Sequence, residues 1–299
     1  MEFGLVCRRA LCYKMEHGHM TGPWPREVRR KELDVRRGAR WQMMNRSPMK
    51  KTPTTFHTLK PFLELFQTGV PVLMYHKIAE APAGARLRGL YVPPGLFARQ
   101  LAELHQAGFV ACRPGATRDG NGPQRRMALT FDDGFRNVWE HALEPLAARR
   151  FSAIQFLVAN FIGRLNQWEM REGERREPLM DAAQVRDWLR AGHRIGSHSL
   201  SHPYLTRLSM RDAREEIVTS KKKLEDTFGV PVEDFCYPYG NWNETVREMV
   251  VEAGYRTACA ADFGVNTPAT SPFSLHRILV RHPTRSLKVL KARLLGKGH

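Results

Sequence analysis

The sequence predicts a parallel α/β fold, in which helices pack outside a sheet that is either open or closed into a barrel. From residue 71 onward, short apolar, β-prone runs alternate with stretches of helical periodicity, which is the pattern of repeated βα units. Polar residues also gather directly after several of these runs, at the carboxyl ends of strands where α/β proteins build their sites. The 299 residues leave room for one large domain or two small ones.

Six short apolar runs, each bounded by turn residues, are predicted to form the strands. They cover residues 71–78, 127–131, 152–158, 194–197, 235–237 and 257–260. No glycine-rich dinucleotide motif and no P-loop sequence follows any of these runs. The two common nucleotide-binding folds therefore lose their support.

Helical periodicity and capping residues mark the segments between these strands. The first helix starts near Pro94, carries Phe97, Leu101 and Leu104 on one face, and stops at Gly108. Further helices are predicted over residues 181–192 with Asp181 as its cap, 209–229 from Ser209 to Gly229, and 244–253. We expect the apolar face of each helix to pack against the sheet.

The formal net charge of +17 lies almost entirely at the two ends of the chain. Residues 1–60 contain 14 basic and 5 acidic side chains, and residues 277–299 contain 7 basic and no acidic ones. The middle of the chain is therefore close to neutral, whereas a nucleic-acid-binding domain carries its basic side chains on the folded body. We do not expect a nucleic-acid partner.

Composition divides the chain into three parts. Residues 1–58 form a basic leader without regular periodicity, which is either disordered or a mis-assigned start. The alternative for this leader is a basic arm that associates peripherally with an anionic membrane surface. Residues 59–280 form the folded catalytic domain, and residues 281–299 form a basic C-terminal helix or tail.

Neither end of the chain indicates export or insertion. No apolar run approaches the ~18 residues of a membrane-spanning helix, and the N-terminus lacks a signal-peptide core. The five cysteines include no CxxC pair, which excludes a cysteine-built zinc module and argues against a disulfide-stapled secreted scaffold. We therefore expect a cytoplasmic protein, or one at the inner membrane face, and the sequence carries no signal of its oligomeric state.

Two polar clusters directly follow predicted strands. Residues 130–134 read Thr-Phe-Asp-Asp-Gly, and residues 198–202 read His-Ser-Leu-Ser-His on a turn, since Pro203 disfavours a helix there. Alone, each has an ordinary explanation as a solvated turn or a histidine-rich loop. Together, two imidazoles and one carboxylate form a three-ligand set with open positions, as in catalytic zinc sites. The second carboxylate can accept a proton from water, so the residues indicate a metal hydrolase.

These clusters and residues 237–240, Tyr-Pro-Tyr-Gly, resemble the first three motifs of the NodB-type polysaccharide deacetylases, carbohydrate esterase family 4. The resemblance extends over roughly residues 65–280, in the family's order. It implies an α/β fold of the distorted (β/α)7-type barrel kind that holds a divalent metal, usually Zn2+. It also implies a hydrolase that removes N- or O-linked acetyl groups from a sugar or polysaccharide and releases acetate.

The resemblance also carries roles to individual positions. It implies that Asp133, His198 and His202 bind the metal and that Asp132 is the catalytic base. It further implies that the backbone N–H of Tyr239 stabilises the oxyanion of the reaction. The substrate-binding surface that it suggests comprises Pro238, Tyr239, Gly240 and Trp242.

The chain departs from the family pattern at three places. Cys236 stands where many members have an arginine that steadies the base, and we expect it to be a small buried strand residue. Residues 275–277 read Leu-His-Arg, so an arginine stands where the family has the histidine of its general acid. An Asp-x-x-Asp-Trp motif is missing near Asp262. His76, at the end of the first predicted strand, is a candidate for the missing acid, the alternative being a histidine hydrogen-bonded within the barrel rim.

Two other functions stay open. One is an amidohydrolase of the same barrel family that acts on a small non-sugar C–N bond, and the other is a glycan-binding pseudoenzyme, suggested by the altered late motifs. A wide groove of aromatic side chains would favour a glycan. The candidates for such a groove, each equally a core residue, are Trp168, Trp188, Tyr239 and Trp242. The insert at residues 162–178 is expected to be a loop on the barrel rim.

Overall fold

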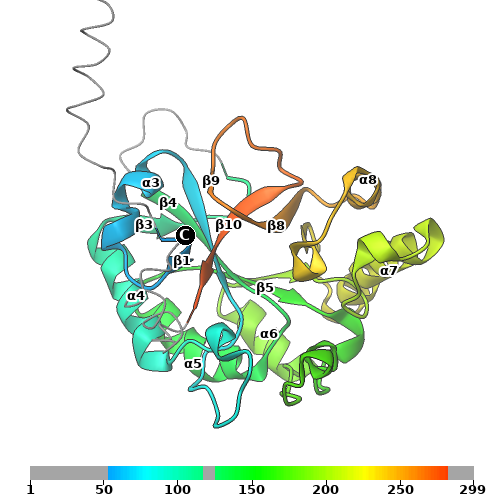
Figure 1. The fold of residues 1–299 in the computed structure, drawn as a ribbon, viewed down its shortest axis with the longest axis horizontal. Coiled ribbons are helices and arrows are strands. Elements are labelled where there is room, and N and C mark those ends of the chain that lie inside the picture. The colour runs from blue at the N-terminus through cyan, green and yellow to red at the C-terminus, as the bar shows by residue number, and fades with distance from the viewer. Residues whose placement is uncertain (1–52, 117–124, 282–299) are drawn as a thin grey trace, which may run out of the picture. The chain divides into compact units, whose positions relative to one another are not determined.

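Seven parallel strands close into a barrel in the computed structural model, which describes residues 53–116 and 125–281 (Figure 1). The barrel strands are β2 (Val70–Tyr75), β4 (Arg125–Phe131), β5 (Ile154–Leu157), β6 (Arg194–Ser197), β7 (Asp234–Cys236), β8 (Thr257–Phe263) and β10 (Leu275–Val280). Each pairs with the next in chain order, and β10 pairs with β2, with Ile278 opposite Leu73. This last pairing closes the ring, so the barrel is correct and the open sheet is not.

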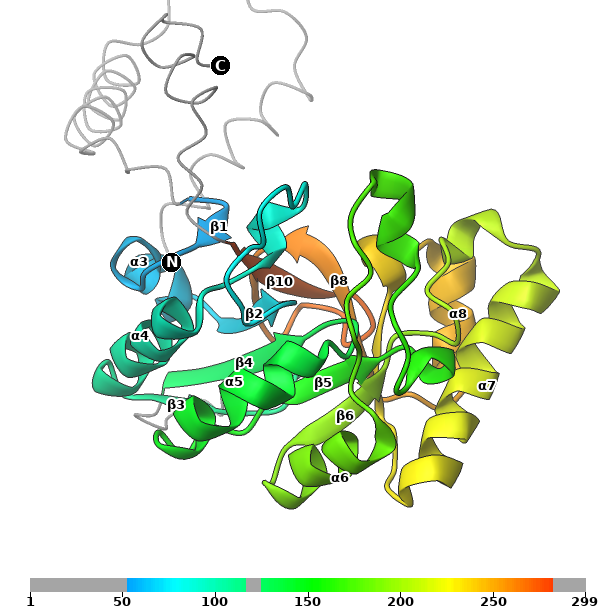
Figure 2. The same ribbon diagram turned by 90° about the horizontal axis from the view of Figure 1, so that it is seen from below.

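The helices pack outside these strands in chain order (Figure 2). They are α3 (Leu63–Gln67), α4 (Pro94–Gln106), α5 (Arg136–Ala147), α6 (Ala182–Arg190), α7 (Met210–Phe228) and α8 (Glu244–Glu252). Short 3-10 turns are η1 (Lys60–Phe62), η2 (Arg88–Leu90), η3 (Ala159–Phe161), η4 (Trp168–Glu172), η5 (Leu205–Arg207) and η6 (Pro238–Gly240). Burial of one apolar stripe per helix against the strands builds the large core, as the sequence predicts.

The capping residues begin and end the helices where the sequence places them. Asp181 and Gln184 form a reciprocal capping box at the start of α6, which satisfies two backbone N–H groups that the helix leaves unpaired. The Ser209 side chain accepts from the backbone of Asp212 at the start of α7, and Gly229 ends that helix in the left-handed conformation. These predicted boundaries are confirmed.

Several elements were not predicted. Helix α5 carries its apolar stripe of Val138, Ala142 and Leu146 but contains Pro145 in its last turn, which obscures the pattern. Strand β10 contains a histidine and an arginine within its apolar run, so it does not read as a buried strand. The short helix α3 and the short strands β1 (Thr55–Phe56), β3 (Phe109–Ala111) and β9 (Val265–Asn266) were also not predicted.

Strand β1 pairs with β10, so the described fold includes residues 55–56, ahead of the domain start predicted at residue 59. Residues 1–52 of the predicted leader and residues 282–299 of the predicted C-terminal helix lie outside the described residues. Among the helices that the structure describes, none is long and apolar enough to span a bilayer.

Candidate metal centre

The two aspartates turn away from the end of β4. Asp132 donates its backbone N–H to the carbonyl of Tyr75 on β2 (3.0 Å), which holds it in line with the barrel. Asp133 and Gly134 both adopt positive φ angles of 75° and 85°. This left-handed conformation is strained for a non-glycine residue such as Asp133. It turns the chain so that both carboxylates lie at one end of the barrel.

The histidines lie on a turn after β6, as predicted. Ser199 and His202 adopt positive φ angles of 65° and 64°, and the Ser199 hydroxyl accepts the backbone N–H of His202 (3.0 Å). Glu216 of α7 accepts the backbone N–H groups of Leu200 (2.9 Å) and Ser201 (2.8 Å). One carboxylate therefore fixes the loop that presents both imidazoles.

Asp133, His198 and His202 converge in a buried group that could hold a metal ion. The Asp133 Oδ1 lies 3.5 Å from His198 Nε2 and 3.3 Å from His202 Nε2, and the two Nε2 atoms are 3.2 Å apart. Ligands about 2.1 Å from a tetrahedral zinc ion are separated by about 3.4 Å. The spacing and the donor types both fit a divalent metal.

The ionisation of these groups favours metal binding. Burial lowers the pKa of His198 to about 4, and the neighbouring His202 adds to this effect, so the imidazole is neutral. Burial raises the pKa of Asp133, but the hydrogen bond and charge of His202 outweigh it and hold that pKa below its usual value. A neutral imidazole and an ionised carboxylate are the states that bind metals.

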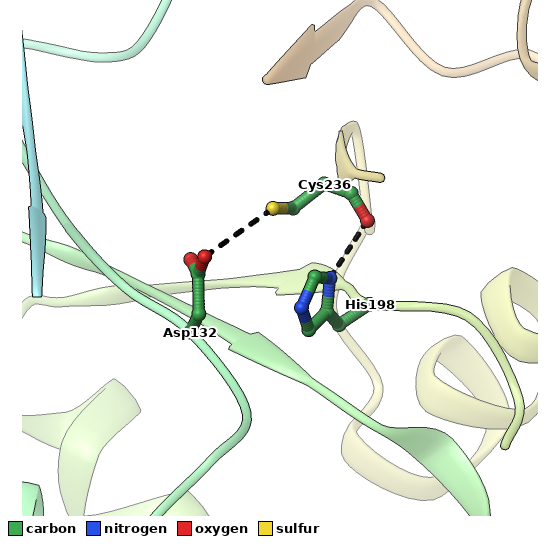
Figure 3. A group of neighbouring side chains, drawn as sticks. All are labelled: Asp132, His198 and Cys236. Carbon is green, nitrogen blue, oxygen red and sulfur yellow. Dashed lines mark hydrogen bonds between the residues drawn. The ribbon is translucent and has the colours of Figure 1, made fainter. Parts of the chain in front are cut away.

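A second group, Asp132, His198 and Cys236, also lies close together (Figure 3). The His198 Nδ1 is 2.7 Å from the carbonyl oxygen of Cys236, which can only accept, so Nδ1 carries the proton and Nε2 the lone pair. The lone pair on Nε2 therefore points to the group that His198 forms with Asp133 and His202, where it could bind a metal ion. Burial raises the pKa of the Cys236 thiol well above its usual value, so the thiol stays protonated and is a poor ligand.

Arg277 supplies the guanidinium that position 236 lacks. Its Nη1 and Nη2 donate to Oδ1 and Oδ2 of Asp132 at 2.7 and 2.9 Å, and its Nε donates to the Ala260 carbonyl at 2.7 Å. The Cys236 sulfur lies 3.1 Å from Nη2, so the small side chain at 236 fits beside the arginine. Positions 236 and 277 are separate departures from the family pattern in the sequence, whereas the structure brings them together on one carboxylate.

This arginine sets the charge of Asp132. Burial raises the pKa of Asp132, but Arg277 and the nearby imidazoles outweigh burial and bring the pKa below its usual value. The guanidinium is itself only 1% exposed, so the pair is a buried ion pair with two charge-assisted hydrogen bonds. The arginine had no sequence signal beyond standing in place of a histidine.

His76 lies at the end of β2, beside the same carboxylate. Its Nε2 is 3.9 Å from Asp132 Oδ2, and its buried Nδ1 has no hydrogen-bond partner among the described residues. Burial lowers the pKa of His76, while Asp132 and then Asp133 partly oppose that effect. The ring therefore lies beside the site, and Nδ1 does not make the rim hydrogen bond of the expected alternative with any residue in the described part of the chain.

The third motif forms η6 after β7. Tyr239 adopts a left-handed φ of 59° and its ring meets His202 edge-on, with 4.5 Å between centroids. Gly240 is required, because a Cβ there would come within 2.9 Å of the Ala261 backbone N. Trp242 stacks on Tyr237 at 6.0 Å and packs against the core instead of the site.

A cleft of about 490 Å³ opens beside the histidines. It is lined by Phe161, Gln167, Trp168, Ser201, His202, Pro203, Tyr204, Arg207, Leu208 and Tyr239. Of the aromatic candidates from the sequence, Trp168 and Tyr239 line this cleft, whereas Trp188 is fully buried in the core. Pro238, Gly240 and Trp242 are not among the lining residues.

The insert at residues 162–178 contributes Trp168, which stacks on His202 with 4.6 Å between ring centroids. A buried ion pair anchors the insert, since Lys77 Nζ lies 2.6 Å from Glu169 Oε2, and Asn166 donates to the same oxygen at 3.0 Å. This pair has no signal in the sequence, because it joins the barrel rim to a loop distant in the chain.

The chain is similar to known polysaccharide deacetylases in sequence and in fold. A family model described as polysaccharide deacetylase matches residues 119–258. YxkH of Bacillus subtilis, whose name assigns it provisionally to the polysaccharide deacetylases, is 25% identical over 216 residues, 71% of each chain. A poly-beta-1,6-N-acetyl-D-glucosamine N-deacetylase of Staphylococcus aureus strain MRSA252 is 22% identical over 70% of this chain and 77% of its own. The solved structure of the Streptococcus pyogenes deacetylase PplD in complex with acetate has a TM-score of 0.62 and 24% identity, covering 75% of this chain and 96% of PplD.

Proposed function

We propose that the chain, whose residues 119–258 match the polysaccharide deacetylase family model, hydrolyses acetyl groups from a sugar or polysaccharide with the help of a bound divalent metal. The observation that carries this proposal is the group of Asp133, His198 and His202, whose ligand atoms lie 3.2 to 3.5 Å apart beside Asp132. We propose zinc as the metal, because two imidazoles and one carboxylate are typical ligands of catalytic zinc.

Bound zinc would polarise the acetyl carbonyl and lower the pKa of the attacking water. Asp132 then acts as the general base and takes a proton from that water. Arg277 keeps the Asp132 carboxylate ionised and aimed, because its two hydrogen bonds fix both oxygens. The supporting evidence is that the carboxylate and the three metal ligands all lie at the same end of the barrel.

His76 is our candidate for the general acid that protonates the leaving amine or hydroxyl. Its Nε2 lies 3.9 Å from Asp132, so the proton donor and the base face the same small volume. The carboxylates of Asp132 and Asp133 favour the protonated imidazole when it forms. Tyr239 would contribute its backbone N–H to the oxyanion, and its ring adjoins His202.

The contact between Arg277 and Asp132 also weakens the argument for a pseudoenzyme. That hypothesis depended on the two altered late motifs, and in one of them, at residues 275–277, Arg277 supplies Asp132 with the guanidinium that Cys236 does not. We therefore favour an active deacetylase over a binding protein. The amidohydrolase hypothesis keeps no separate support, since no described feature selects a small non-sugar substrate.

The test is the metal content of the purified protein together with acetate release from acetylated chito-oligosaccharides. We expect about one zinc per chain, lost in Asp133→Ala and His198→Ala, and acetate release that depends on it. His141→Ala is a matched control, since this histidine is exposed on α5, away from the cluster. Absence of metal binding in the wild type after zinc is supplied would overturn the proposal.

A further inference from the structure

Four cationic and aromatic side chains form a continuous stack along the cleft beside the metal site. The guanidinium carbon of Arg207 lies 4.3 Å from the centre of the Tyr204 ring. Tyr204 stacks on Tyr239 at 3.8 Å with only 5° between the ring planes, and Tyr239 meets His202 at 4.5 Å. The stack therefore leads from a candidate metal ligand to an arginine at the other end.

The stack is held in place by the two loops that carry it. Tyr204 lies directly before η5 and Arg207 is the last residue of this turn, which buries Leu205 in the core. Thr206 in the same turn hydrogen-bonds to Asn241, just after η6, at 2.5 Å. This bond ties the loop of Arg207 to the loop of Tyr239, so the backbone that carries the arginine is held beside the site.

The charge of the cleft has one sign. Arg207 is the only lysine or arginine among its lining residues, which include no aspartate or glutamate. In the described part of the chain, no carboxylate forms an ion pair with Arg207. Its positive charge is therefore available to a ligand in the cleft.

The stacked geometry prepares this arginine for an oxyanion. A guanidinium that lies over a tyrosine ring uses its face for the ring and keeps the N–H groups at its edge for other partners. That edge matches two oxygens of a carboxylate or phosphate in a bidentate arrangement. The tyrosine rings beside it offer the flat apolar surface on which a sugar ring packs.

We infer that this cleft binds a sugar unit bearing a carboxylate or phosphate, next to the unit that is deacetylated. The inference rests on the proposed function and names its substrate class, an acidic acetylated glycan. Arg207 is the residue that distinguishes the acidic from the neutral glycan, and Tyr204 and Tyr239 form the surface for the sugar ring.

The experiment compares three acetylated substrates of similar length. They are a neutral chito-oligosaccharide, an oligosaccharide alternating N-acetylglucosamine with N-acetylmuramic acid, and an N-acetylglucosamine oligomer joined by phosphodiesters. We expect the wild type to prefer an acidic substrate in kcat/KM, and Arg207→Gln to lower the ratio of acidic to neutral activity about tenfold. The two acidic arms distinguish a carboxylate from a phosphate source.

Two further variants make the result specific. Arg207→Lys keeps the charge but loses the planar fork, so we expect a ratio between those of the wild type and Arg207→Gln. Arg211→Gln is the matched control, because Arg211 is an exposed arginine near the start of α7 that pairs with Asp212 and does not line the cleft. It should leave the ratio as it is.

Binding to the metal-free protein separates this inference from the proposed function. Calorimetric titration of the chelator-treated wild type and Arg207→Gln with the same three oligosaccharides requires no turnover. Acidic and neutral oligosaccharides bound equally by the wild type, or an unchanged ratio in Arg207→Gln, would overturn the inference. Selective binding without acetate release from any substrate by the zinc-loaded wild type would instead support the cleft and contradict the deacetylase.

Discussion

Arg277 on β10 and Asp132 after β4 form two parallel hydrogen bonds of 2.7 and 2.9 Å, although they lie 145 positions apart in the chain. Strand β2 separates β4 from β10 in the closed barrel, so the arginine reaches the carboxylate across the barrel interior. The charge of the proposed base therefore depends on a contact that forms only when the pairing of β10 with β2 closes the barrel.

Replacing Arg277 by glutamine should reduce activity more than substrate affinity. The change leaves the buried Asp132 carboxylate without its cation, and Arg277 is what counters burial in lowering the pKa of Asp132. That pKa should rise, so the acidic limb of the pH profile of kcat should move to higher pH. We expect kcat to fall about 100-fold, comparable to removal of a general base, with KM changed less.

Loss of the partner of a buried charge also costs about 3–5 kcal/mol of stability. Denaturant unfolding of Arg277→Gln checks this, and activity is compared only under conditions where the variant is folded. An acidic limb at the same pH as the wild type would contradict the role of Arg277.

The double variant Cys236→Arg, Arg277→His should recover part of the activity lost in Arg277→Gln. Cys236 Sγ lies 3.7 Å from Asp132 Oδ2 and 3.1 Å from Arg277 Nη2, so both positions face one carboxylate. An arginine at 236 can then take over the contact, provided that the smaller histidine at 277 leaves it room. The measurement is kcat/KM of the double variant beside that of Cys236→Arg and Arg277→His. Cys236→Arg alone should be less active than the double variant, because two guanidinium groups would crowd the same space.

The candidate metal ligands are easier to recognise in the sequence than the residues around them, for a physical reason. The local sequence points to Asp133, His198 and His202, because their residue types bind metals and they follow apolar strands. The local sequence does not point to Arg277, since its role depends on a contact across the barrel with Asp132 that no local pattern encodes. For the same reason β10 escaped prediction, as a buried arginine interrupts its apolar run. The buried pair of Lys77 and Glu169 is hidden likewise, because each looks like an ordinary surface charge until the fold brings them together.

Glu169→Gln should destabilise the protein and loosen the insert that carries Trp168. The Lys77 ammonium is fully buried between the rings of Tyr91 and Phe135, and without the carboxylate its charge has no ionic partner in the described structure. We expect a loss of about 3–5 kcal/mol in the free energy of unfolding, and faster proteolysis within residues 162–178.

A double variant tests the pairing. Lys77→Met combined with Glu169→Gln removes both charges, so it should be more stable than Glu169→Gln alone. The measurement is a double-mutant cycle by denaturant unfolding. If the effects of the two single variants simply add, the ion pair contributes nothing and the prediction is wrong.

His193 should make the stability of the protein depend on pH below neutrality. Its ring packs on Trp188 with 4.3 Å between centroids, and its buried Nδ1 has no hydrogen-bond partner among the described residues. Burial lowers the pKa of His193 from 6.5 to about 4, so the unfolded chain binds this proton more readily than the folded one. The stabilising effect of the neutral ring is complete above pH 6.5 and is lost as the pH falls from 6.5 toward 4, by at most about 1.4 kcal/mol per pH unit.

His193→Phe keeps a ring on Trp188 and cannot titrate, so the difference in unfolding free energy between the variant and the wild type should grow in favour of the variant between pH 7 and pH 4.5. Unfolding curves in denaturant at these two pH values check this, and a difference that stays constant would show that His193 is protonated equally in the folded and unfolded chains.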